Sequence, residues 1–153
     1  MFLRFCFAKS KKQRCDRCIV YISVFLGKFR SLSSAAQAEK VLEEIRSILL
    51  DAFWSADGGA IAACGEDNYV AFAAWDTDTT RKNVEKCREE IGKCLQSNNA
   101  LNLVDVRFGA FFAVGSLLTF DEAMGRAKQA CMVAQNEKIA YAEWDINSGK
   151  ALE

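Results

Sequence analysis

A nearly continuous apolar run near the start of the chain, residues 19–25 (IVYISVF), is the feature that most constrains the fold. Apolar residues that are continuous rather than alternating indicate a strand covered on both faces. A second long strand is predicted over residues 103–114 (LVDVRFGAFFAV). Gly109 interrupts it, which indicates a bulge or the close approach of another backbone. We therefore expect two central strands in a sheet with helices on both faces.

Three amphipathic helices are predicted around these strands. The first follows Ser33 or Ser34 as its cap and runs to about Phe53, and the second covers residues 76–96. The third covers residues 119–137, with Thr119 or Asp121 as its cap. The side chains expected to be buried are Val41, Ile45, Leu49, Val84, Ile91 and Met124.

The remaining elements are a hairpin and a last strand. Residues 60–64 and 69–75 form the hairpin around the turn GEDN, and residues 139–144 form the strand. The chain of 153 residues has no proline and no repeat that would divide it. The prediction is one α+β domain in which helices flank a mixed sheet of about five strands.

Composition narrows the function classes. Twenty basic and twenty acidic residues balance, so nucleic acid is not expected as a partner. No apolar run approaches the length of a membrane span and no export signal is recognised, so we expect no direct insertion into a membrane. We predict a cytoplasmic location, with the cytoplasmic domain of a larger protein as the alternative. The seven cysteines are interpreted as reduced thiols, and the CxxC at Cys15 and Cys18 as structural, with a metal or redox role as the alternative. The absence of histidine removes the usual general base, so catalysis would need carboxylates, cysteine or metal.

The order of these segments resembles the GGDEF domain family of diguanylate cyclases. The hairpin turn Gly65-Glu66-Asp67-Asn68-Tyr69 stands where the family has its GGDEF signature. The pieces VFLGKFRSLS, AEKVLEEI, VRFGAFFA and DEAMGRAKQACMVAQ resemble, in order, the other family motifs. The resemblance implies a palm-like nucleotidyl-cyclase fold, binding of GTP with divalent metal, and two-metal phosphoryl transfer.

Several family site positions carry other residues here. The two strand-end aspartates that hold metal fall at Phe25 and Gly27, neither of which has a side-chain ligand for a hard cation. The guanine-contacting asparagine falls at Ser33, and Glu39 is the candidate for the guanine-contacting acid. A family lysine that faces phosphate falls at Gln135.

The signature turn is also altered. It keeps Gly65 and Asp67, but Glu66 replaces a glycine and Asn68 replaces a glutamate. Asp67 is interpreted as a turn residue, with a weak ligand contact as the alternative. Ser33, Glu39 and Asp67 remain as the residual nucleotide-binding residues, with no catalytic residue and no metal site expected.

These substitutions predict a degenerate GGDEF-like domain that does not catalyse and acts as a regulatory or protein-interaction module in cyclic-di-GMP-type signalling. The alternatives are a divergent active cyclase or GTP sensor, and a purely structural dimerisation domain. Expected partners are other signalling domains or a second copy, with GTP bound weakly or not at all. No cofactor is expected. Mg²⁺ would bind only if some GTP binding remains. The predicted organisation is a connector at residues 1–18, the domain at 19–146 and a tail at 147–153.

Overall fold

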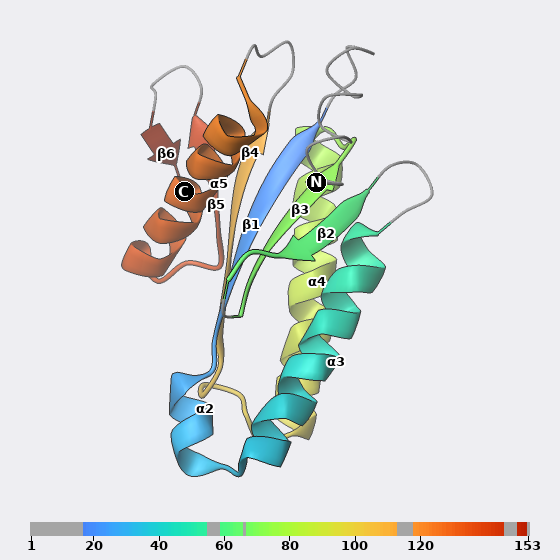
Figure 1. Ribbon diagram of the computed structural model, residues 1–153, viewed down its shortest axis with the longest axis vertical. Helices are drawn as coiled ribbons and strands as arrows, with labels where there is room; N and C mark the ends of the chain where they lie inside the picture. The colour runs from blue at the N-terminus through green and yellow to red at the C-terminus, as the bar shows by residue number, and fades with distance from the viewer. Residues whose placement is uncertain (1–16, 55–58, 66, 113–117, 146–149, 153) are drawn as a thin grey trace.

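The computed structural model describes residues 17–54, 59–65, 67–112, 118–145 and 150–152. In this part of the chain, a single mixed sheet forms the centre of the fold (Figure 1). The strand order is β2-β3-β1-β4-β5-β6. Neighbouring strands are antiparallel except for β4 and β5, which are parallel. The strands are β1 (Cys18–Phe25), β2 (Ala60–Ala63), β3 (Asn68–Ala73), β4 (Asp105–Phe112), β5 (Tyr141–Asp145) and β6 (Lys150–Leu152).

Helices cover both faces of this sheet. In Figure 1, α3 and α4 lie side by side against one face, and α5 lies against the other. The short α2 follows the end of β1 and leads into α3. The helices are α2 (Gly27–Leu32), α3 (Ala35–Phe53), α4 (Thr77–Ser97) and α5 (Phe120–Glu137). The α+β sandwich predicted from the sequence is confirmed.

The two-sided core explains why β1 reads as a continuous apolar run. Val20 and Ile22 point into the cluster shared with α3 and α4. Ile19 and Tyr21 point into the cluster shared with α5. Because alternate side chains of a strand face opposite sides of the sheet, both sets must be apolar when both sides are covered.

Gly109 of β4 marks the closest approach of α5 to the sheet. A Cβ atom added there would lie 2.1 Å from the backbone nitrogen of Cys131 and 2.3 Å from the carbonyl oxygen of Ala127. Only a residue without a side chain fits between the strand and the helix. The close backbone approach predicted at this glycine is confirmed.

Side-chain caps set the starts of the three long helices. Ser34, rather than Ser33, caps α3, and its hydroxyl accepts from the backbone N–H of Gln37. Thr119, rather than Asp121, caps α5 through a capping box with Glu122. These local hydrogen bonds satisfy N–H groups that the helix itself leaves unpaired.

The structure corrects several details of the sequence prediction. The first strand ends at Phe25 as predicted, but the residues that follow form α2, a helix that the sequence prediction missed. The second long strand begins at Asp105 and not at residue 103. Met124 is only half-buried against the α5 side of the core, because it lies at the margin of the contact between α5 and the sheet.

The sheet also gains a sixth strand, because part of the segment assigned to a tail pairs with β5 as β6. Residues 1–16 of the predicted connector, among them Cys15 of the CxxC, lie outside the described residues. Among the described helices, none is long and apolar enough to cross a bilayer.

Candidate functional site

The altered signature turn joins β2 to β3 and lies against the end of β1. The backbone N–H of Cys64 donates to the carbonyl of Asn68 at 3.0 Å and closes the turn. Gly65 has a φ of 142° and Asp67 one of 57°. Aspartate tolerates this left-handed conformation better than most residues, while glycine meets no steric penalty there. Glu66 lies outside the described residues.

Two contacts tie Asp67 to neighbouring elements. Its carbonyl accepts from the backbone N–H of Val24 at 3.0 Å, which fixes the turn to β1. Its carboxylate forms an ion pair with Arg30 of α2, with 3.0 Å between Oδ2 and Nη1. The Asp67 side chain is only 13% exposed. The acid therefore has a structural partner, supplied by the short helix that the sequence prediction missed.

The two positions that the resemblance assigns to metal ligands form an apolar surface. Phe25, the last residue of β1, is 60% exposed. Its ring lies over Gly27, since a Cβ atom built at Gly27 would be 2.5 Å from the ring carbon Cζ. A carboxylate at position 27 would therefore have to displace the ring before it could reach a cation.

The end of α5 also reaches this region. The side-chain amide of Gln135 donates to the hydroxyl of Ser23 at 2.8 Å, two residues before the end of β1. The position that the resemblance assigns to a phosphate-facing lysine is thus close to β1. It carries a neutral amide that already has a hydrogen-bond partner.

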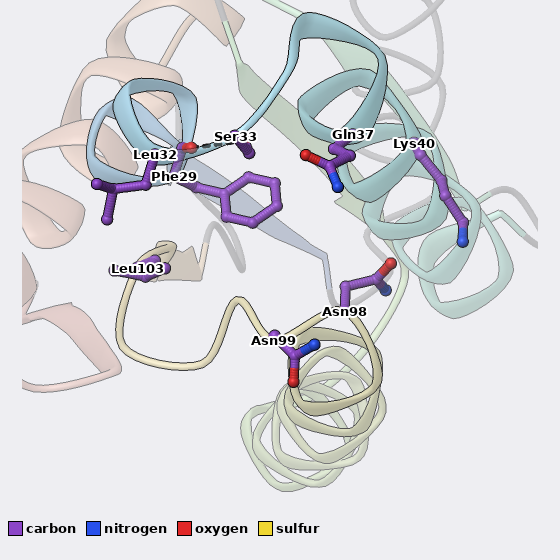
Figure 2. Close-up of a pocket in the computed structure, with 8 residues that line it drawn as sticks. All are labelled: Phe29, Leu32, Ser33, Gln37, Lys40, Asn98, Asn99 and Leu103. Atoms are coloured by element: carbon purple, nitrogen blue, oxygen red, sulfur yellow. Dashed lines mark hydrogen bonds between the residues drawn. The ribbon is translucent and has the colours of Figure 1, made fainter.

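Ser33 lines a pocket of about 380 Å³ between α2, the start of α3 and the segment after α4 (Figure 2). Figure 2 shows the ring of Phe29 and the amide of Gln37 facing this space. The Ser33 hydroxyl donates to the Phe29 carbonyl at 2.6 Å, so its lone pairs remain to accept a hydrogen bond. Lys40, Asn98 and Asn99 supply the remaining polar side chains.

Glu39 does not line this pocket. Its carboxylate instead lies 3.2 Å from Nη1 of Arg46, a later residue of the same helix α3. Nε of the same arginine donates to the Tyr69 hydroxyl at 2.8 Å, so Arg46 joins Glu39 to the signature hairpin. Glu39 and Tyr69 thus belong to one network, from which Ser33 is separate.

Within the described residues, no group of three or more Cys, Asp or Glu side chains is arranged to hold a metal ion. The five described cysteines are free thiols. Burial raises the pKa of Cys18 and Cys131 to about 11 and that of Cys87 to about 12. Thiols held in the neutral form are poor nucleophiles and poor metal ligands.

The structure therefore brings only some of the predicted residues together. Asp67, Phe25 and Gly27 lie around the end of β1, while Ser33 and Glu39 face different surroundings. Sequence reasoning missed Arg30 and Arg46, because both are exposed basic residues whose partners are distant in sequence. No sequence signal distinguishes them from other surface arginines.

No family model and no curated protein matches this chain, whereas solved structures do. The GGDEF domain of DgcB from Caulobacter crescentus in complex with c-di-GMP superimposes with a TM-score of 0.79 at 13% identity, over 92% of this chain and 85% of that one. The active GGEEF domain of a diguanylate cyclase from Vibrio cholerae gives 0.77 at 13% identity, over 91% and 88%.

A bacterial light-regulated adenylyl cyclase is also similar, with a TM-score of 0.60 at 14% identity over 84% of this chain and 75% of that one. Identities this low carry information about the fold and not about activity. The chain has the fold of the GGDEF domains of diguanylate cyclases.

Proposed function

We propose that this chain is a GGDEF-like domain without cyclase activity, which serves as a regulatory or protein-interaction module in a cyclic-di-GMP-type signalling protein. The observation that carries the proposal is the surface at the end of β1, where the Phe25 ring lies over Gly27. Two-metal phosphoryl transfer needs oxygen ligands that hold the cations against the phosphates. This surface offers aromatic carbon instead.

The ion pair of Asp67 supports the same conclusion. A carboxylate already paired with Arg30 at 3.0 Å would have to give up that partner before it could bind a cation. Gln135, bonded to Ser23, adds no positive charge for phosphate. The end of β1, Asp67 and Gln135 together favour a domain with the GGDEF fold and without cyclase activity.

The test is incubation of the protein with GTP and either Mg²⁺ or Mn²⁺, followed by chromatography for cyclic di-GMP. We expect no product at any metal concentration. Product that requires metal and disappears in an Asp67→Ala variant would overturn the proposal, since it would show that the turn still works in catalysis.

A nucleotide sensor is the second candidate, favoured by the polar pocket that includes Ser33. Calorimetric titration with GTP, ATP and cyclic di-GMP separates it from the interaction module. Submicromolar affinity for one of them would support the sensor. Binding of none would leave the interaction module as the function of the domain.

A further inference from the structure

The short strand β2 forms one edge of the sheet, and β6 forms the other (Figure 1). The sequence of β2 is AIAA, so the strand carries neither a charge nor a proline. Proteins commonly protect an edge strand from pairing with another chain by placing charged residues or proline on it. The opposite edge strand, β6, contains Lys150. The edge at β2 has neither of these protections.

Every second residue of β2 turns its backbone groups away from the sheet. The N–H of Cys64 donates to the carbonyl of Asn68, in register with the rest of the pairing between β2 and β3. Because hydrogen-bonded and non-bonded pairs alternate in an antiparallel ladder, Ile61 and Ala63 direct their N–H and C=O groups outward. In the part of the chain that the structure describes, no hydrogen bond reaches these four groups.

This edge is open to solvent. Ala62 and Ala63 are both exposed, although their side chains point to opposite faces of the sheet. A helix that extended over either face at this point would bury one of the two side chains. Neither α3 nor α5 therefore covers this part of the edge, and another strand can reach the outward backbone groups.

The outward groups are complementary to themselves. An antiparallel β2 strand from a second copy, with Ala62 opposite its own counterpart, would place Ile61 opposite Ala63 in both directions. Each of these two residue pairs would exchange two hydrogen bonds, so every outward N–H and C=O of Ile61 and Ala63 would gain a partner. A two-fold axis at this point uses the same surface on both copies and closes the assembly as a dimer.

The helix beside β2 adds an apolar side chain to this surface. Nε of Arg46 donates to the hydroxyl of Tyr69, and Tyr69 lies opposite Ala63 in the hairpin. Leu50 follows Arg46 by one turn, so it lies on the same side of α3, and it is 48% exposed. A two-fold axis perpendicular to the sheet would bring the Leu50 side chains of both copies to the same face. The formal net charge of zero adds no long-range repulsion between copies.

We propose that two copies of this chain pair through β2 and form one continuous antiparallel junction, with Ala62 at the two-fold axis and both α3 helices on one face. This interface shares no residue with the Ser33 pocket or with the end of β1. It goes beyond the proposed function, because the dimer forms whether or not the domain binds nucleotide. The cyclase assay and the tests of the dimer can therefore fail independently.

Sedimentation equilibrium of the full chain at micromolar to millimolar concentrations tests the proposal. We expect a monomer–dimer equilibrium. Ala62→Lys should raise the dissociation constant of the dimer at least about tenfold, because two like charges would face each other across the axis. Ala36→Lys adds the same charge at an exposed alanine at the start of α3, ten residues before Arg46, and should leave the constant unchanged. A monomeric chain, or equal weakening by both variants, would overturn the proposal, and the monomer would leave the edge to a strand of another protein.

A charge-swap experiment tests the position of the axis. Ala62→Glu alone should also weaken the dimer, whereas an equimolar mixture of Ala62→Glu and Ala62→Lys should restore it as a mixed dimer. Only a residue that faces its own counterpart gives this result, and a mixture that stays monomeric would contradict the pairing. Circular dichroism checks that both variants fold.

Amide hydrogen exchange of the natural chain, followed by NMR, locates the interface. The N–H groups of Ile61 and Ala63 should exchange more slowly as the protein concentration rises, because the dimer supplies their hydrogen-bond partners. The N–H of Cys64, already bonded to Asn68, is the control and should respond less. Exchange at Ile61 and Ala63 that is independent of concentration in a chain that dimerises would place the interface elsewhere and overturn the proposal.

Discussion

The carboxylate of Asp67 and the guanidinium of Arg30 form an ion pair, with 3.0 Å between Oδ2 and Nη1. The pair links the altered signature turn to α2 and leaves the acid only 13% exposed. A residue that the sequence marks as a candidate ligand contact is thus held by a neighbouring helix. The contribution of this pair to stability can be tested directly.

Asp67→Asn should lower the free energy of unfolding by less than about 1 kcal/mol, measured by urea denaturation. Asparagine accepts the left-handed backbone of this position, so the change removes the charge and keeps the turn. Arg30 is nearly half exposed, and such pairs contribute little because water screens them. In the double variant with Arg30→Gln, the two losses should be less than additive, whereas strict additivity would show that the pair does not interact.

Gly109→Ala should destabilise the fold by about 3 kcal/mol or prevent folding, because the added methyl group would overlap backbone atoms of α5. Gly92→Ala on α4 is the matched control. A Cβ atom there meets nothing within 4 Å, and alanine stabilises a helix interior by about 0.5–1 kcal/mol relative to glycine. Thermal unfolding of the two variants should move in opposite directions, and a tolerated Gly109→Ala would refute the packing shown here.

Stability should fall as the pH rises above about 9. Burial raises the pKa of the Cys87 thiol from its ordinary value of 9.0 to about 12, so between these values the unfolded chain releases a proton that the folded chain keeps. The stabilisation is complete below pH 9 and is lost as the pH approaches 12. Cys18 and Cys131, with pKa values of about 11, act in the same direction.

Surface lysines also titrate in this range, so the Cys87→Ala variant serves as the control. The difference in unfolding free energy between the natural chain and the variant should shrink from about pH 8 to about pH 10. In this range the Cys87 thiol ionises in the unfolded chain and stays neutral in the folded one. A constant difference would mean that Cys87 titrates alike in both states.

GTP should bind with a dissociation constant above about 100 μM. An intact site would bind it at about micromolar concentration, and this site lacks two or three charge-assisted contacts to metal and phosphate. Glu39→Ala should leave that weak binding unchanged, since the carboxylate pairs with Arg46 outside the pocket. Glu43→Ala, which removes the other carboxylate beside Arg46, is the control. Tight binding that Glu39→Ala alone weakens would show instead that Glu39 turns toward the ligand.

The sequence alone determined the layers of this protein. The continuous apolar run of β1 requires cover on both faces, and the apolar stripes of α3, α4 and α5 provide it. Gly109 also predicted either a bulge or the close approach of a second backbone, and the structure has the close approach. These features follow from local periodicity and from side-chain volume, which are properties of neighbouring residues.

Only the tertiary structure decided what surrounds each site residue. Arg30 pairs with Asp67 across 37 positions of the chain, and Glu39 pairs with Arg46 outside the Ser33 pocket. An exposed arginine has many potential partners, and the choice depends on how α2 and α3 are oriented on the sheet. Short-range sequence patterns predict the fold class, whereas the partner of each charged side chain depends on long-range packing.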